Sequence, residues 1–500
     1  MRYMRLAALA ALLASVLSGA EPAQAGRLLV WKDQKVRSYD EPALPGRSAN
    51  PLPPPDQGAT RANARTEWAR SSRADPVKRA ISRALLAGQI QPGDRDRYLK
   101  IYGASVRLRS RLPFTRAREL SHVIDTLRLI ARQKLLSASR MPALFLILDR
   151  NREWWGSKGP PASGARVRFA PSELIFQYYP GQGLQIQPLA NFGFANGLWY
   201  SKKVERLRNL INELVSLRVD RAGFSAWEYY FDFGGGSPPW ISGMTQGTAM
   251  QAISRAGTLL SDPALLQIAS GAVGAFETPT PNGVRVNAGS GAWYPLYSFA
   301  PRLEVLNGML QALIGLDTYR TLTGDPRGTA LFDAGNALAQ ARIGSYDTGA
   351  WSLYSRSNGS DGAEANLNYH TLNRDFARRL CKITSAEPYC TAAGNFTRYL
   401  KEDPTLEPFG PAPAPARAGR GVRFYFTLSK VGRVGITVRG AGRTYLSTSA
   451  PFSRGKHSFR WIPPRSASER TYEYTLFAKD LAGNSHTENG SLRVKRARAP

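Results

Sequence analysis

The sequence predicts a multidomain α+β protein in which a mainly helical region is followed by an all-β domain. Two patterns support this class. Up to about residue 405, apolar residues mostly recur every three or four positions, the spacing of amphipathic helices. Beyond a Pro-rich stretch near residue 411, apolar and polar residues alternate, the spacing of strands with one buried face.

The first 25 residues have the pattern of a secretory signal peptide. Arg2 and Arg5 precede the apolar residues 6–17, and Ala23-Gln24-Ala25 offers a small-residue cleavage site. The apolar stretch is shorter than the roughly 20 residues that a membrane-spanning helix needs. We therefore expect a secreted or cell-envelope protein with no membrane span after signal cleavage. An uncleaved membrane anchor is the alternative.

Residues 26–74 are rich in Pro, Arg and Ser and predict a linker without a core. Asp75-Pro76 then supplies an N-cap and a first-turn proline, so a helical N-terminal region is expected over residues 75–165. A second helix in this region is predicted from about Thr115 to Leu136, because its apolar residues recur at three- and four-residue spacing.

Residues 166–405 predict a second, larger helical domain that opens with a small β element. Extended apolar runs flank the turn at Pro180–Gly183, and helices dominate from about residue 188. Asp-Pro pairs at 262–263 and 325–326 each open a helix. Helix pairs joined by short capped turns predict antiparallel packing, here in an (α/α)-barrel-like domain.

A Pro-rich linker is predicted over residues 406–418, and a β-sandwich over residues 419–497. Turn signals fall about every ten residues in the latter, which favours the immunoglobulin class. Residues 455–461 and 478–484 also resemble strand ends of bacterial immunoglobulin-like modules. Such a module either binds glycan or spaces the rest of the chain from a surface.

The chain carries 67 Lys and Arg against 37 Asp and Glu, a net charge of +30. A basic surface attracts polyanions, and for an exported protein we expect an acidic polysaccharide and no nucleic acid. The alternative is that the arginines only reflect general composition. The two cysteines, Cys381 and Cys390, leave a disulfide and two buried thiols equally open, and together with His370 they lack the spacing of a metal site.

Three sequence blocks lie in the helical region. The first is Pro239-Trp240-Ile241-Ser242-Gly243-Met244-Thr245-Gln246-Gly247, and the second runs from Trp293 to Leu316. The third joins Tyr346-Asp347-Thr348-Gly349, Tyr354 and Tyr369-His370-Thr371. In their order and spacing these blocks resemble the C-terminal domain of D-glucuronyl C5-epimerases, which invert glucuronate to iduronate within heparan-type chains. The residues before about Arg166 carry no such resemblance.

The resemblance implies a cofactor-independent epimerase acting on a glucuronate-containing polysaccharide. Such a reaction removes a proton beside a carboxylate, so it needs a base, an acid, and donors around that carboxylate. The resemblance assigns proton transfer to Tyr369 and Tyr354 and places Tyr297 in the same cleft. It assigns substrate binding to four further residues: Arg356, Asn307, Gln246 and His370. For His370 the alternative is that it supports Tyr369.

This chain departs from the animal members of that family at several positions. Leu296 stands where they have an acid, Asn373 replaces their second histidine, and the arginine matched to Arg356 is displaced by one residue. Two alternatives therefore stay open: a uronate polysaccharide lyase and a non-catalytic acidic-glycan-binding protein. The oligomeric state is also open, with a homodimer as one possible form.

Overall fold

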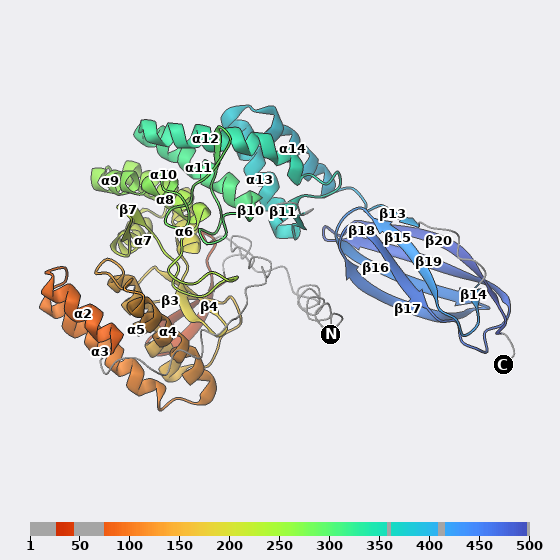
Figure 1. The fold of residues 1–500 in the computed structure, drawn as a ribbon, viewed down its shortest axis with the longest axis horizontal. Helices are drawn as coiled ribbons and strands as arrows, with labels where there is room; N and C mark the ends of the chain where they lie inside the picture. The colour runs from red at the N-terminus through yellow and green to blue at the C-terminus, as the bar shows by residue number, and fades with distance from the viewer. Residues whose placement is uncertain (1–26, 45–74, 358–361, 409–415, 498–500) are drawn as a thin grey trace. The chain divides into compact units, whose positions relative to one another are not determined.

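The computed structural model describes residues 27–44, 75–357, 362–408 and 416–497 (Figure 1). These residues fall into two compact units, one up to Ala339 and the other from Gln340 onward. Helices and sheets are both extensive, so the predicted multidomain α+β class is confirmed. The predicted signal peptide and residues 45–74 of the predicted linker lie outside the described residues. In the described part of the chain, no helix is long and apolar enough to cross a membrane.

The first unit opens with a five-stranded sheet in the order β2-β1-β3-β4-β5. β1 and β2 form an antiparallel hairpin, and β1 pairs in parallel with β3. The strand bounds are β1 (Arg27–Lys32), β2 (Lys35–Asp40), β3 (Arg166–Phe169), β4 (Ile175–Tyr179) and β5 (Gly183–Ile186).

The prediction of a coreless linker over residues 26–74 is wrong for residues 27–40. Trp31 of β1 is buried, its indole Nε1 donates to Glu153 at 2.7 Å, and its ring packs on Trp154 and Phe169. These partners lie more than 120 residues away along the chain. Local composition therefore could not reveal that the segment has a core.

Four helices follow the hairpin, and the first begins at the predicted cap. The Asp75 carboxylate accepts hydrogen bonds from the backbone of Val77 and Lys78. The second predicted helix is also present, over Phe114–Arg132. The bounds are α2 (Pro76–Leu86), α3 (Pro92–Arg109), α4 (Phe114–Arg132) and α5 (Met141–Ser157).

The rest of this unit is built around α8, which is buried on nearly all sides. α8 packs closely on α11, where a Cβ on Gly315 would collide with the backbone of Gly247. Two glycines of the sequence blocks thus serve helix contact. The helices are α6 (Pro188–Tyr200), α7 (Val204–Ser216), α8 (Gly243–Leu259), α9 (Pro263–Gly271), α10 (Gly274–Glu277), α11 (Leu306–Thr323) and α12 (Pro326–Ile343), the last crossing the unit boundary. The short strands are β6 (Val219–Arg221), β7 (Phe224–Ala226), β8 (Val286–Ala288), β9 (Gly291–Trp293) and β10 (Glu304–Val305).

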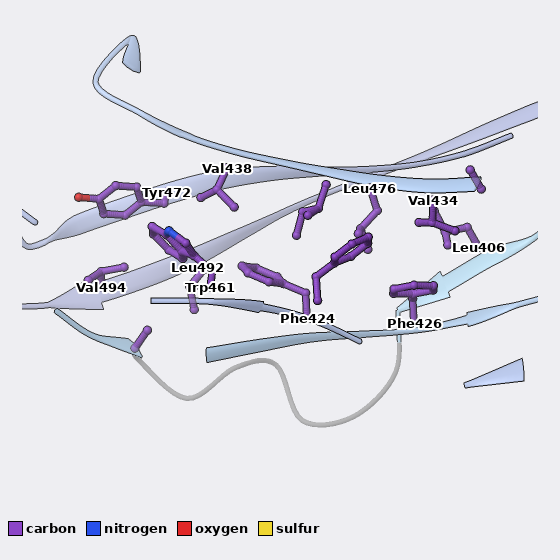
Figure 2. Packing of buried hydrophobic residues seen from close by; sticks show 14 of the residues in the cluster. Leu406, Phe424, Phe426, Val434, Val438, Trp461, Tyr472, Leu476, Leu492 and Val494 are labelled. Carbon is purple, nitrogen blue, oxygen red and sulfur yellow. The ribbon is translucent and has the colours of Figure 1, made fainter. Parts of the chain in front are cut away.

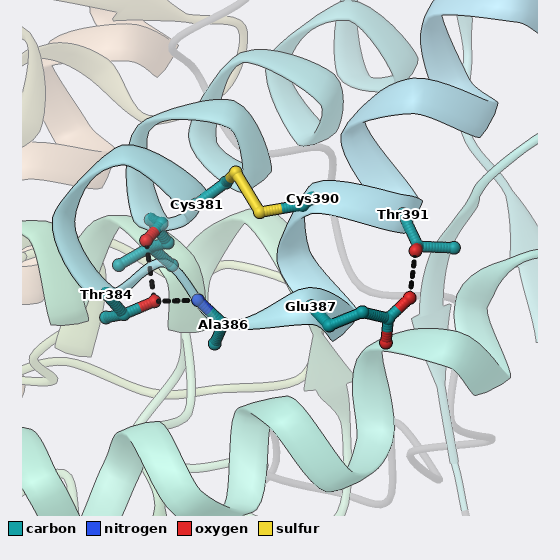
Figure 3. Close-up of a disulfide and its surroundings, with 7 residues drawn as sticks. Cys381, Thr384, Ala386, Glu387, Cys390 and Thr391 are labelled. Carbon is teal, nitrogen blue, oxygen red and sulfur yellow. Dashed lines mark hydrogen bonds between the residues drawn. A yellow bond between two sulfur atoms is a disulfide. The ribbon is translucent and has the colours of Figure 1, made fainter.

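The second unit continues with a short 3₁₀ turn, the paired strands β11 and β12, and two helices. A disulfide joins Cys381 and Cys390, and Thr384 closes the turn between the helices by donating to Leu380 and accepting from Ala386 (Figure 3). The disulfide that the sequence left open is therefore present. The elements are η3 (Gly344–Tyr346), β11 (Leu353–Arg356), β12 (Ala363–Glu364), α13 (Leu367–Thr384) and α14 (Glu387–Tyr399).

The C-terminal part of this unit consists of two sheets that enclose one apolar core (Figure 2). Their orders are β13-β15-β18 and β14-β20-β19-β16-β17. The alternation predicted around Phe424 and Val434 is confirmed, because both side chains lie in this core. The bounds are β13 (Leu406–Pro408), β14 (Ala416–Arg417), β15 (Val422–Leu428), β16 (Gly432–Gly440), β17 (Arg443–Phe452), β18 (Gly455–Trp461), β19 (Arg470–Asp480) and β20 (Ser485–Lys495).

The linker predicted over residues 406–418 is wrong at its two ends. β13 pairs with β15, placing Leu406 opposite Leu428 in the core, and β14 pairs with β20. Residues 409–415 of the predicted linker lie outside the described residues. The prolines that suggested a linker stand mostly in that segment, so composition extended the prediction too far on both sides.

A buried lysine joins these sheets to the helices of their own unit. Lys430, in the turn between β15 and β16, is 1% exposed and lies 2.8 Å from the carboxylate of Asp480. Its ammonium also donates to the backbone carbonyls of Tyr399 and Glu402, at and just after the end of α14. All three of its protons thus have acceptors.

Candidate functional site

The seven residues implied by the sequence fall in both units. Gln246, Tyr297 and Asn307 belong to the unit that ends at Ala339. Four others belong to the unit that begins at Gln340: Tyr354, Arg356, Tyr369 and His370.

In the second unit, Tyr354 and Tyr369 lie together. Their ring centroids are 4.8 Å apart and the planes are tilted by 55°, and each residue is 3% exposed. Tyr369 stands in the first turn of α13, where the Asn366 side chain accepts from its backbone N–H at 2.9 Å. The N-cap therefore fixes the backbone of one tyrosine against the other.

Tyr354 occupies an irregular position in its strand. Leu353 is opposite Glu364 while Ser355 is opposite Ala363, so Tyr354 and Ser355 together oppose one residue of β12. Such a β-bulge bends a strand and re-aims a side chain, and bulges are common beside active sites. The bulge gives a physical reason for the orientation of Tyr354 toward α13.

His370 follows Tyr369 and is held entirely by protein groups. Its Nδ1 accepts from the Ser352 backbone at 3.2 Å and lies 2.8 Å from the Ser352 hydroxyl, so its Nε2 carries the proton and donates to the Phe396 carbonyl at 2.9 Å. The ring stacks on Trp351 at 3.7 Å, and burial lowers the pKa of His370 to about 4. With both nitrogens engaged and no exposed surface, His370 has nothing to offer a substrate, and the geometry favours the alternative role of support for Tyr369.

Arg356 ends β11 and is half-buried. Its Nη1 donates to the Ser345 carbonyl in η3 at 2.8 Å. A guanidinium has five N–H donors, so this bond positions the group and leaves others for a carboxylate.

Polar residues that the sequence did not assign to the site hold its framework. The Asn373 amide donates to the Ser352 hydroxyl at 3.1 Å and to the Leu353 carbonyl at 3.0 Å, which ties α13 to β11. Asp347 accepts from Tyr399 and Asn395, both at 2.8 Å, and so ties the loop before β11 to α14. Their roles depend on partners up to 52 residues away, which no local pattern shows.

In the first unit, Tyr297 belongs to a buried aromatic cluster with Phe233, Trp240 and Phe299, whose ring centroids lie 5.4–5.9 Å from its own. Gln246 is also fully buried. Its amide donates to the Trp227 carbonyl at 2.9 Å and accepts from the Trp227 N–H at 3.3 Å. The predicted substrate contact of Gln246 is not favoured, because a backbone segment occupies its polar atoms.

Asn307 is different. It stands in the first turn of α11, is 1% exposed, and within the described residues neither its Oδ1 nor its Nδ2 has a hydrogen-bond partner. Buried amides are nearly always hydrogen-bonded. An unsatisfied buried amide lowers stability, which makes Asn307 the strongest candidate for ligand binding among the three predicted residues of this unit.

Leu296 marks the position where the sequence lacked an acid. Its side chain is fully buried and packs at Gly308, where an added Cβ would lie 3.0 Å from the Leu296 Cβ. No proton can be exchanged from this position. Across the part of the chain that the structure describes, no group of three His, Cys, Asp or Glu side chains could hold a metal ion.

Comparison with known proteins agrees with the sequence blocks. Residues 221–398 match the family model described as D-glucuronyl C5-epimerase C-terminus. A D-glucuronyl C5-epimerase of Caenorhabditis elegans is 27% identical over 180 residues, 32% of this chain and 29% of the relative. An uncharacterized protein of Methanocaldococcus jannaschii is 27% identical over 158 residues, 30% of this chain and 50% of the relative. The matched segment thus spans half or less of these relatives.

Among solved structures, a cellobiose 2-epimerase of Bacillus thermoamylovorans aligns with 57% of this chain and 75% of its own, at 11% identity. The TM-score is 0.36, too low to support an argument about fold or function.

Proposed function

We propose, starting from the fact that residues 221–398 of this chain belong to the D-glucuronyl C5-epimerase C-terminus family, that the protein is a carbohydrate epimerase. Its reaction is inversion at C5 of D-glucuronate residues to L-iduronate within an acidic polysaccharide. The observation that carries the proposal is that Tyr354 and Tyr369 lie together inside the family segment, with ring centroids 4.8 Å apart.

The reaction needs one base and one acid on opposite faces of the sugar. A phenolate of the tyrosine pair takes the C5 proton, the electron pair of the broken C–H bond spreads onto the neighbouring carboxylate, and an acid on the opposite face of the sugar returns a proton. An ordinary tyrosine has a pKa near 10, so the base must lie beside positive charge, which favours the phenolate. Arg356, on the strand that carries Tyr354, is the group that we assign to this task and to the substrate carboxylate.

The remaining features of the proposal follow from the sequence. Asn307 binds the sugar, and Tyr297 lines the cleft. The helical region around the site, residues 166–405, is an (α/α)-barrel-like domain, and residues 419–497 form an immunoglobulin-like module. The protein is exported through its signal peptide and meets its polymer outside the cell or in the envelope.

Hydrogen exchange at C5 tests the proposal. The purified protein is incubated with heparosan, an unsulfated glucuronate polymer, in deuterated water, and C5 is followed by NMR. We expect deuterium at C5 and iduronate signals, both lost in Tyr354→Phe and Tyr369→Phe. Tyr389→Phe is the control, because Tyr389 is equally buried in α14 of the same unit and lies outside the pair. An unsaturated product would instead identify a lyase.

Leu296 favours a second candidate, a non-catalytic protein that binds acidic glycans. If the family acid is indispensable, a buried leucine there ends the chemistry but leaves binding intact. Binding of heparosan without any exchange, on sulfated and unsulfated polymers alike, would replace the first proposal with this one.

A further inference from the structure

One outer face of the C-terminal sheets is basic and carries an exposed aromatic ring. β15 and β18 pair antiparallel, and their inward side chains, such as Phe426 and Trp461, fill the core. Their outward side chains form three rows: Arg423 opposite Arg460, Tyr425 opposite Ser458, and Thr427 opposite Lys456. We call these six residues the basic face.

The charges on this face are of one sign. Neither β15 nor β18 contains an acidic residue, and Arg423 stands directly opposite Arg460, a pairing that destabilises a sheet. The nearest acid in the ladder is Glu407 of β13, opposite Thr427 at one corner. By contrast, in the other sheet Arg439 of β16 stands opposite Glu473 of β19.

The arginines are held in place on the sheet. Arg423 donates to the Ser458 hydroxyl at 3.2 Å. Arg460 lies across Gly421, where an added Cβ would be 2.9 Å from its Nε. Tyr425 lies between the charged rows with 42% of its surface exposed. The result is a flat strip about 13 Å long, at about 3.3 Å per residue, with cations, hydroxyls and one ring.

We propose that the basic face binds the acidic polysaccharide, apart from the site of the tyrosine pair. Arginines bind carboxylates in a bidentate manner, Thr427 and Ser458 offer hydrogen bonds to sugar hydroxyls, and Tyr425 offers a flat apolar surface to a sugar ring. A membrane surface would call for several exposed apolar side chains, and the face has one ring. The inference takes its ligand class from the proposed function and needs no turnover.

Binding of full-length protein to heparosan, measured by calorimetry, tests this. We expect Arg423→Ala/Arg460→Ala to weaken binding about tenfold or more, because two charge-assisted contacts are lost. Arg439→Ala/Arg443→Ala removes the same charge from exposed positions of the other sheet and should change affinity by less than about twofold. Tyr425→Ala should weaken heparosan binding, and C5 exchange on a short oligosaccharide should stay unchanged in all these variants.

Each other outcome has a definite meaning. Equal losses in the two double variants would show attraction to net charge and overturn the inference. The inference would also be overturned if single-stranded DNA bound as tightly as heparosan and Tyr425→Ala weakened both affinities equally. The basic face would then be a nucleic-acid surface. Binding that depends on the basic face without exchange on any polymer would sink the epimerase proposal alone.

Discussion

Three buried asparagines differ in the number of hydrogen bonds that their amides make. Asn191 donates to the carbonyls of Ile175 and Gln187 and accepts from the Ile175 N–H, and Asn151 is similarly satisfied. Asn307 has no such partner among the described residues. A buried amide without partners lowers stability by about 1–3 kcal/mol, so the difference points to a residue kept for binding.

Replacing Asn307 with Leu should therefore separate stability from activity. The change removes an unsatisfied amide, so the free energy of unfolding should stay the same or rise. The rate of C5 exchange should fall by roughly a hundredfold or more, because the transition state loses a hydrogen-bond donor. Urea unfolding and NMR exchange measure the two effects. Asn191→Leu is the control and should destabilise the protein by about 2–4 kcal/mol. A loss of that size in Asn307→Leu would mean that the amide is bonded after all.

His370 should make stability depend on pH. Its pKa is about 4 in the folded protein against an ordinary 6.5, so between these values the unfolded chain binds more protons. The stabilisation is complete above pH 6.5 and is lost as the pH falls through 4, by about 3 kcal/mol in all. His370→Gln keeps a donor toward Phe396 but cannot titrate. The difference between the urea curves of parent and variant should shrink from pH 7 to pH 4.5; a constant difference would show that His370 does not stay neutral.

At this scale the sequence predicted part of the site. Resemblance brought Tyr354 and Tyr369 together, and the structure places their rings in contact. It could not show that Gln246 is hydrogen-bonded to Trp227, or that His370 is hydrogen-bonded to Ser352 and Phe396. Hydrogen-bond partners are set by the folded chain.

Among the elements, α13 and α14 act as one support for the tyrosine pair. The disulfide joins them near the turn, and the Phe396 carbonyl of α14 receives the hydrogen bond of His370 on α13. The Lys430 ammonium lies at the C-terminal end of α14, where a helix favours positive charge.

Loss of the disulfide should weaken this support. The cysteines are nine residues apart, and closing so short a loop corresponds to roughly 2–3 kcal/mol in the chain-entropy model. Cys381→Ser/Cys390→Ser should lower the free energy of unfolding by about that amount. Dithiothreitol should destabilise the parent equally and leave the double variant unaffected. An effect of the reductant on the variant would point to another cause.

Lys430 should matter more than any exposed lysine. Lys430→Met leaves the buried carboxylate of Asp480 without its cation, which typically destabilises a protein by about 3–5 kcal/mol. Lys479→Met, one residue before Asp480 and exposed, should change stability by less than about 0.5 kcal/mol. Chemical unfolding compares them, and Lys430→Met/Asp480→Asn should recover part of the loss. Equal effects of the two single variants would contradict the buried pairing.

Element boundaries were predictable where the signal was local. The Asp75 cap begins α2, and alternation marks β15 and β16. The strands β1 and β13 were missed because the residues that bury them belong to other elements. Trp31 of β1 packs on Trp154 of α5 and on Phe169 of β3, and β13 pairs with β15.

For the whole molecule, the family segment and the unit boundary do not coincide. The family match ends at residue 398, while the unit that contains Tyr354 and Tyr369 runs on through the C-terminal sheets. Glu364 of β12 accepts from the backbone of Val431 and Arg454 in those sheets, at 2.9 and 2.8 Å. The sequence predicted these sheets as a module of their own, and the hydrogen bonds of Glu364 and Lys430 join them to the other elements of the same unit.

A cut in the chain should show this directly. A protease site placed within residues 409–415 divides the protein without breaking any contact described above. We expect both fragments to co-elute on gel filtration after cleavage, because Lys430 and Glu364 hold them together. In Lys430→Met the fragments should separate more readily. If the two fragments of the protein without the Lys430→Met change separated at once in native buffer, only the peptide chain would connect them.

The buried Lys430 also bears on ancestry. Domains joined only by a flexible linker can be exchanged between genes singly by recombination, because they need no complementary contacts in the recipient protein. Here the lysine comes from the β-sheet end of the chain, while two of its acceptors, the Tyr399 and Glu402 carbonyls, come from the helical end. A recombination that joined foreign sheets to these helices would leave the end of α14 without its cation, so successful exchanges should carry α14 and the sheets together.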